Sequence, residues 1–164
     1  MPLQPIPSAL ILPVDGRQSA TASAIARGTA RLLHALGFSC VAELPLPSGR
    51  RADLVALNGR GEVWILEIKS SLDDLRADQK WPDYRLHCDR LFFAFTAELS
   101  PDIFPADTGL IVADAYGAEL KREAPEHRLP PATRKLMTLR FGLAAAQRLN
   151  RLADPQGHAA ADLL

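Results

Sequence analysis

The segment EVWILEIKSS, residues 62–71, begins as a buried β-strand and ends in charged residues. Because side chains alternate across a strand, Glu67 and Lys69 share one face with the apolar residues before them, and the other face is entirely apolar. A strand that is apolar on both faces is typical of the centre of an α/β sheet. An acid and an amine at the end of such a strand therefore indicate a functional site.

The preceding strand supplies a second acid. RADLVAL, residues 51–57, is joined to the charged strand by an Asn-Gly-Arg-Gly connection. If this is a three-residue loop with Gly61 in the left-handed conformation, Asn58 pairs with Glu62 and Asp53 lies opposite Glu67. A two-residue loop would offset the faces instead. In the favoured register Asp53, Glu67 and Lys69 meet at one end of the sheet.

Two carboxylates this close repel each other unless a cation lies between them or one of them is protonated. Oxygen ligands favour Mg²⁺ or Mn²⁺ over zinc, and Mg²⁺ accepts carboxylates together with waters and substrate phosphate. We therefore predict that Asp53 and Glu67 bind the metal for phosphate chemistry, while Lys69 orients the attacking water and stabilises charge. The alternative is a solvated strand end in which Asp53 pairs with Arg51 or Lys69. The spacing alone gives the two interpretations about equal weight.

The rest of the chain predicts one α/β domain over residues 19–152, a sandwich with a central mixed β-sheet flanked by helices on both faces. Residues 1–18 are expected to form an extended N-terminal arm, and residues 153–164 a C-terminal tail. Helices are expected at 19–36, from Ser70 or Ser71 to about Trp81, and at 132–152, and strands at 38–46, 51–57, 62–70, 89–96, 108–116 and 117–122. In the last helix, Leu136, Leu139 and Leu143 are expected on the buried face.

Composition excludes several classes of protein. The 164 residues include 19 basic and 19 acidic side chains, so no overall field attracts nucleic acid or an anionic membrane. Two cysteines make neither a disulfide framework nor a zinc cluster, and we expect reduced thiols. The longest early apolar run, ALILPV, is too short to span a membrane or to act as a signal peptide. We expect a cytoplasmic protein that contacts no membrane.

Positive charge is nevertheless concentrated near the end of the chain. Residues 127–153 contain six Arg and Lys residues and no acid. Four arginines fall within about one third of the helical wheel, away from the leucines, and are candidates for contact with a DNA backbone: Arg134, Arg140, Arg148 and Arg151. A solvated helix face paired with acidic loops is an equally weighted alternative.

Further DNA-binding candidates lie near the predicted site. Arg50 and Arg51 precede Asp53 and could guide a DNA strand, and Gln79 and Lys80 are expected on the second helix, close to the predicted acids. A solvated helix face is the simpler interpretation of Gln79 and Lys80. Nearby, Trp81 could stack on unpaired bases, although we favour packing between the helix and the sheet.

Three segments carry a resemblance to a known family. RRADLVAL (50–57), EIKSSLDDLRADQKWPDY (67–84) and CDRLFFAF (88–95), in this order, are similar to the MmcB-type bacterial DNA repair proteins, to which endonuclease activity is attributed. The Asp on one strand and Glu-x-Lys on the next also resemble the signature of the PD-(D/E)XK nuclease superfamily. The similarity covers roughly residues 19–150.

The resemblance implies a restriction-endonuclease-like core that cleaves DNA with Mg²⁺ or Mn²⁺. Asp53 and Glu67 would be metal ligands, the backbone carbonyl of Ile68 a further ligand, and Lys69 the catalytic lysine. The superfamily often adds an acid from the first helix, but residues 17–36 contain none, and Glu43 is the nearby substitute.

The resemblance leaves two functions open. The alternative to an endonuclease is a non-catalytic DNA-binding or adaptor protein on the same fold, acting with other repair proteins. The oligomeric state stays open, a homodimer included.

Overall fold

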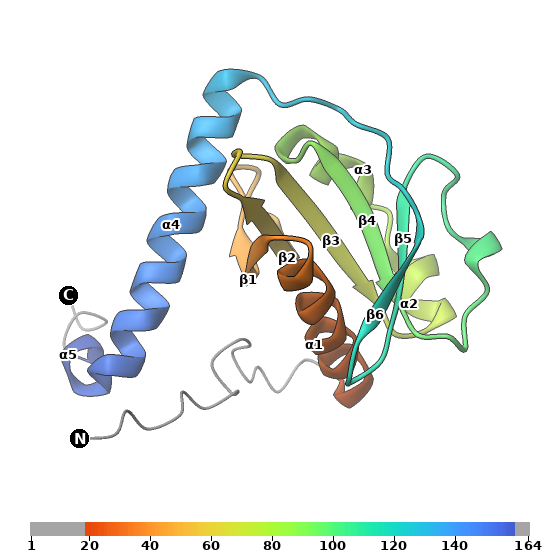
Figure 1. Cartoon of the computed structure of the whole chain (residues 1–164), viewed down its shortest axis with the longest axis horizontal. Helices are drawn as coiled ribbons and strands as arrows, with labels where there is room; N and C mark the ends of the chain where they lie inside the picture. Colours follow the sequence, from red (N-terminus) through yellow and green to blue (C-terminus); the bar gives the residue numbers. More distant parts are fainter. Residues whose placement is uncertain (1–18, 160–164) are drawn as a thin grey trace.

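A computed structural model describes residues 19–159 and contains one six-stranded mixed sheet (Figure 1). The strands lie in chain order, β1-β2-β3-β4-β5-β6. The first three are antiparallel, β3, β4 and β5 are parallel, and β6 returns antiparallel at the far edge. The predicted α/β fold with a mixed sheet is confirmed. The expected arm, residues 1–18, lies outside the described residues.

The observed elements follow the predicted order closely. The strands are β1 Phe38–Pro45, β2 Arg51–Asn58, β3 Val63–Lys69, β4 Arg90–Phe95, β5 Gly109–Ala113 and β6 Ala118–Arg122. The helices are α1 Ala20–Ala35, α2 Leu72–Ala77, α3 Trp81–Tyr84, α4 Pro131–Ala153 and α5 Pro155–Ala159, and short 3₁₀ turns occur at Arg85–His87 and Pro101–Ile103.

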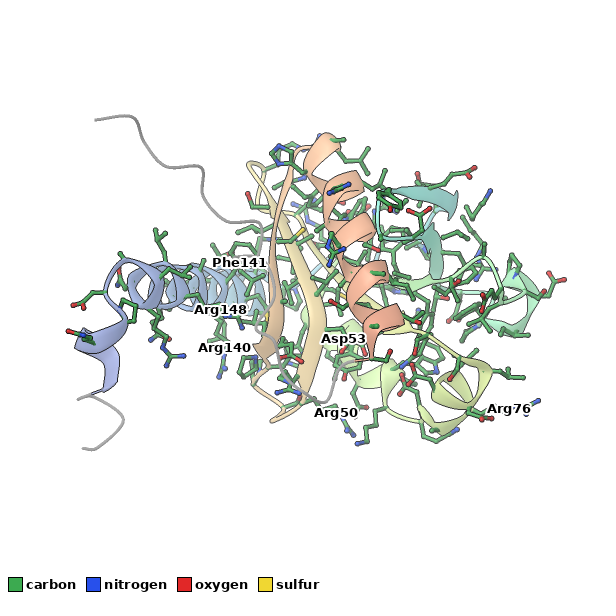
Figure 2. All side chains as sticks on the ribbon, turned by 90° about the horizontal axis from the view of Figure 1, so that it is seen from below. Arg50, Asp53, Arg76, Arg140, Phe141 and Arg148 are labelled. Atoms are coloured by element: carbon green, nitrogen blue, oxygen red, sulfur yellow. The ribbon has the colours of Figure 1, made fainter. Side chains whose placement is uncertain are left out.

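Helices cover both faces of the sheet, as expected. Figure 2 shows α1 and α4 on opposite sides of the strands. Ile25 and Leu33 of α1 pack on one core, whereas Met137 and Phe141 of α4 pack on the other. Gly28 lets α1 approach the β5–β6 turn closely, because a Cβ there would lie 2.0 Å from the carbonyl oxygen of Asp114.

The register of the β2–β3 hairpin is the favoured one. Leu54 pairs with Leu66, and extending this register places Asp53 opposite Glu67. Gly61 has a φ of +79°, and its N–H donates to the carbonyl of Asn58 over 3.0 Å. The three-residue loop therefore sets which side chains meet at the far end of the hairpin.

Strand β1 has an irregular residue, Glu43, next to Asp53 of β2. Glu43 has a φ of +50°, the one positive φ of a non-glycine residue in the described range. Ala42 packs in the core beneath α1, whereas Leu44 packs in the opposite core. Alternate residues of a regular strand share a face, so the strand reverses its faces at Glu43. Left-handed backbone at a residue with a Cβ costs about 1–3 kcal/mol, and such strain clusters at functional sites.

The prediction of a single helix from Ser70 or Ser71 to Trp81 is wrong, because the segment forms two short helices. It is divided into α2 and α3, and Gln79 and Lys80 lie between them, not on a helix. Asp78 explains the break. Its Oδ1 accepts from the N–H groups of Lys80 (2.9 Å) and Trp81 (3.2 Å) and so holds the turn before α3, and Pro82 favours the first turn of that helix.

The orientation predicted for the last helix is also wrong. Leu136, Leu139 and Leu143 are exposed, and the residues that face the sheet are Met137, Phe141, Ala144 and Ala145. Arginine contacts fix this rotation, because Arg134 binds Asp89 and Arg140 donates to the Pro45 carbonyl at the sheet edge. The helical wheel separated the leucine face from the arginine face correctly, but the arginine face lies toward the sheet and the leucine face lies toward solvent.

The described residues contain no disulfide, as expected. Cys40 and Cys88 are free and belong to different cores, and burial raises the pKa of each thiol to about 12. Among residues 19–159, no helix combines the length and hydrophobicity that crossing a membrane requires.

Candidate metal and phosphate site

The predicted acids and the predicted lysine share one open pocket. It has a volume of about 500 Å³ and lies where β2 begins and β3 ends, beside the start of α1. Asp53, Glu67, Lys69 and the predicted additional ligands Ile68 and Glu43 all line it. Glu43, Asp53 and Glu67 stand at matching positions on β1, β2 and β3, so three adjacent strands each contribute one acid.

Asp53 and Glu67 are held by each other's strand. Oδ2 of Asp53 accepts from the N–H of Ile68 over 2.8 Å, and Oε1 of Glu67 accepts from the N–H of Asp53 over 3.2 Å. Each carboxylate has a second oxygen with which it can bind a cation. Backbone hydrogen bonds thus fix the positions of both carboxylates without a bound ligand.

Both acids are poorly stabilised as anions. Burial, and after it the charge of Asp53, raises the pKa of Glu67 well above its usual value. Burial also raises the pKa of Asp53, although the N–H of Ile68 and the charge of Lys69 oppose the shift. A divalent cation between the two groups would relieve this repulsion.

Lys69 is 5% exposed and forms an ion pair with an acid that the sequence analysis did not identify. Its Nζ lies 2.7 Å from Oδ2 of Asp78, and both side chains are buried. Burial alone would lower the pKa of Lys69, but the hydrogen bond and charge of Asp78, with the charges of Glu67 and Asp74, raise it. Lys69 is therefore a cation in the pocket and suits charge stabilisation.

Asp74 and Asp78 are the functional candidates that sequence reasoning missed. Both line the pocket, and Oδ2 of Asp74 accepts from the N–H of Ser70, directly after Lys69. The signal for Asp74 was present in the sequence, since an acid three residues after Ser71 is typical of a capped helix start, and the Ser71 hydroxyl accepts from the N–H of Asp74. The signal for Asp78 was Pro82, which favours the first turn of a helix over its last.

The donors suit a hard cation with few protein ligands. Among residues 19–159, no group of three or more His, Cys, Asp or Glu side chains converges to hold a metal ion. Asp53 and Glu67 would therefore be a pair of carboxylates, a number that Mg²⁺ accepts when waters and phosphate complete its shell. Glu43 instead forms an ion pair with Arg51, in which Oε1 of Glu43 lies 3.5 Å from Nη2 of Arg51.

The predicted DNA-binding residues fall into two groups. Arg51 and Lys80 line the pocket itself, whereas Arg50 pairs with Asp83 and Gln79 donates to the carbonyl of Arg76. Two of the four predicted residues, Arg51 and Lys80, therefore lie in the pocket that holds the acids.

The arginines of α4 are placed differently from one another. Arg148 donates to the carbonyl of Glu43 and Arg140 to that of Pro45, so both contact the edge strand β1. Figure 2 shows these two arginines on the α4 side of the sheet and Asp53 on the α1 side. Arg151 is exposed near the end of α4. Arg134 lies at the other end, where it binds Asp89 with both Nη atoms at 2.7 Å.

Comparison with known proteins identifies the family. A family model described as DNA repair protein MmcB-like matches residues 11–156. The chain belongs to the MmcB-like family. This membership supports a role in DNA repair. A search of curated proteins gave no match.

One solved structure is similar to this MmcB-like chain over most of its length. It is a protein described as of unknown function from Silicibacter pomeroyi, with 45% sequence identity and a TM-score of 0.82. The match covers 86% of this chain and 97% of that one. The MmcB-like fold is thus the same in both proteins.

Proposed function

We propose that this protein is a metal-dependent endonuclease that acts in DNA repair and has a restriction-endonuclease-like core. One observation carries the proposal: Asp53, Glu67 and Lys69, from two paired strands, line a single open pocket. The family's role in DNA repair provides the substrate class. Arg51 and Lys80 also line the pocket, and their positive charges would attract a phosphate backbone.

The chain's own groups have distinct tasks in this proposal. Asp53 and Glu67 would hold Mg²⁺ or Mn²⁺, and the carbonyl of Ile68 is a further candidate ligand. When bound, such an ion lowers the pKa of water and stabilises charge on a transferring phosphate. Lys69 holds its proton and orients the water and the phosphate, while Asp78 fixes the position of Lys69.

The proposal is tested by cleavage assays in Mg²⁺ and Mn²⁺ on plasmid, single-stranded and branched DNA. We expect Asp53→Asn, Glu67→Gln and Lys69→Met each to lower the rate by about two orders of magnitude or more, as loss of one transition-state contact does. Glu98→Gln, at an exposed acid outside the pocket, is the matched control and should cut like wild type. Equal cutting by all four variants would refute the assignment.

An adaptor function is the second candidate, and a specific observation favours it. Lys69 is already paired with Asp78, and the described residues offer the metal two carboxylates and no third. Thermal unfolding with and without Mg²⁺ separates the two functions, because an ion that binds only the folded state raises the melting temperature. An endonuclease should show this rise and lose it in Asp53→Asn, whereas an adaptor need show neither.

A further inference from the structure

The outward face of α4 carries a row of exposed leucines. Leu136, Leu139 and Leu143 follow the i, i+3, i+7 spacing of a helix that packs on another helix. Leu86, which follows α3, continues the row, because Leu86 and Leu136 line the same hollow. We call these four residues the leucine patch; their exposed fractions are 70% for Leu86, 42% for Leu136, 53% for Leu139 and 62% for Leu143.

Two hollows flank the patch at the start of α4. One, of about 630 Å³, contains Leu86 and Leu136, and the other, of about 540 Å³, contains Leu139. Arg128 lines both hollows, and no acidic side chain of the described residues lines either. The surface is therefore apolar along its centre and positively charged at its border.

Lys135 of α4 adds to this border because it lines the second hollow with Leu139. Arg134, Arg140 and Arg148 of the same helix instead contact Asp89 and the edge of β1. The helix has five Arg and Lys residues and no acid over residues 131–153. Lys135 and Arg151 form no hydrogen bond or ion pair within residues 19–159, so their charges are available to a partner. A second copy of this helix would bring like charges together across the leucines, which disfavours self-association.

Nucleic acid is also a poor match for the leucines. A phosphate backbone binds basic and polar groups, and this row presents a continuous apolar stripe between them. Exposed contiguous apolar surface with a polar border is typical of protein–protein contact. Leucines at helical spacing take up the apolar face of another helix.

We propose that the leucine patch docks an amphipathic helix of a partner protein, with leucine-like residues on one face and acidic residues beside them. From Leu136 to Leu143 the patch spans about 10 Å along α4, so two to three turns of the partner suffice. This surface lies apart from the pocket that holds Asp53 and Glu67, since no residue of the patch lines that pocket. The contact does not depend on the endonuclease proposal.

The test uses the full chain and a fluorescein-labelled synthetic helix with leucines at every third and fourth position and glutamates on its flanks. Fluorescence anisotropy should detect binding that weakens with added salt. The double variant Leu139→Ser, Leu143→Ser should bind at least tenfold more weakly, and Lys135→Glu should also weaken binding. Tyr116→Ser is the control, because Tyr116 is 82% exposed but lies in the β5–β6 connection.

Several results would overturn the proposal. One is absence of binding by wild type, and another is equal binding of a peptide in which lysines replace the glutamates. A wild-type dimer that the double leucine variant converts to a monomer would assign the patch to a second copy. Loss of duplex DNA binding in that variant, without peptide binding by wild type, would assign it to DNA. If the peptide binds only after Leu10→Ser, Ile11→Ser and Leu12→Ser, the chain's own N-terminal segment occupies the patch.

Discussion

The Lys69–Asp78 pair joins the end of β3 to the break between α2 and α3. Its side chains are 7% and 10% exposed, so each charge depends on the other. Removing one member of a buried pair leaves an uncompensated charge, which is strongly destabilising. The pair therefore acts on stability as well as on the proposed chemistry.

We predict that Asp78→Asn lowers the free energy of unfolding by about 3 kcal/mol. Urea denaturation of the two proteins measures the difference. The matched control is Asp83→Asn, which removes an equally short but exposed ion pair with Arg50 and should cost less than about 1 kcal/mol. Equal losses in the two variants would contradict a structural role for burial of the Lys69–Asp78 pair.

Glu67, by contrast, is a proposed metal ligand whose negative charge destabilises the folded protein. Its pKa is raised in the folded protein, chiefly by burial and then by Asp53. The folded state thus binds more protons than the unfolded state, and stability falls as pH rises from the ordinary glutamate value toward the raised one. Above that window the folded protein carries the full cost of a buried anion.

Glu67→Gln should therefore raise the free energy of unfolding at pH 7 without added metal, by about 1 kcal/mol. It should also abolish stabilisation by Mg²⁺. Differential scanning calorimetry at pH 7, with EDTA and then with Mg²⁺, gives both values. A variant less stable than wild type in EDTA would mean that Glu67 supports the fold.

At this scale the sequence predicts the central acids well. Alternation and one loop length are enough to bring Asp53 and Glu67 together, because both rules act over a few residues. Asp78 was missed because its contact with Lys69 depends on where the chain turns after α2. Pro82 indicates that a new helix starts near this point, but it does not indicate which side chain the turn brings to Lys69.

At the scale of helices and strands, Asp89 joins three elements: β3, α4 and the linker that precedes α4. This carboxylate is 2% exposed and accepts from the N–H groups of Val63 and Leu129 and from both Nη atoms of Arg134. Burial would raise the pKa of Asp89, but these donors lower it below its usual value. A single anion thus fixes the start of α4 to the start of β3.

We expect Arg134→Ala to lower the free energy of unfolding by about 3 kcal/mol, because it leaves Asp89 buried without its counter-ion. The loss should shrink at low pH. Since the folded pKa of Asp89 is depressed, its stabilising effect is fully present above the unfolded value of about 3.9 and disappears as pH falls through the folded value. Urea denaturation at pH 7 and at pH 3 tests the sign. Arg151→Ala, at an exposed arginine of the same helix, is the control and should change stability by less than about 0.5 kcal/mol.

The same junction explains why the rotation of α4 could not be predicted. Its wheel has two apolar stripes, one with Met137 and Phe141 and one with three leucines, and hydrophobicity favours the leucines. The choice between them is made by long-range contacts of the arginines with Asp89, Pro45 and Glu43. A period of 3.6 residues indicates faces but not which of them meets the sheet.

For the molecule as a whole, equal numbers of acidic and basic residues mean that DNA must be attracted locally. The proposed approach follows the edge of β1, where Arg140 and Arg148 lie, and ends at the pocket mouth with Arg51 and Lys80. The acids within the pocket repel phosphate until a cation is bound. DNA affinity should therefore rise with Mg²⁺ as well as fall with monovalent salt.

Lys80 provides the sharpest test, since its side chain lines the pocket mouth and is exposed. In Ca²⁺, chosen to bind oxygen ligands while slowing cleavage, Lys80→Gln should weaken binding of a DNA duplex and reduce the slope of log affinity against log salt by about 1, the value for one lost phosphate contact. Lys121→Gln removes a lysine from β6, on the opposite edge of the sheet, and should leave the slope unchanged. Because both variants change net charge equally, an equal fall in slope would mean that DNA responds to overall charge and does not enter the pocket.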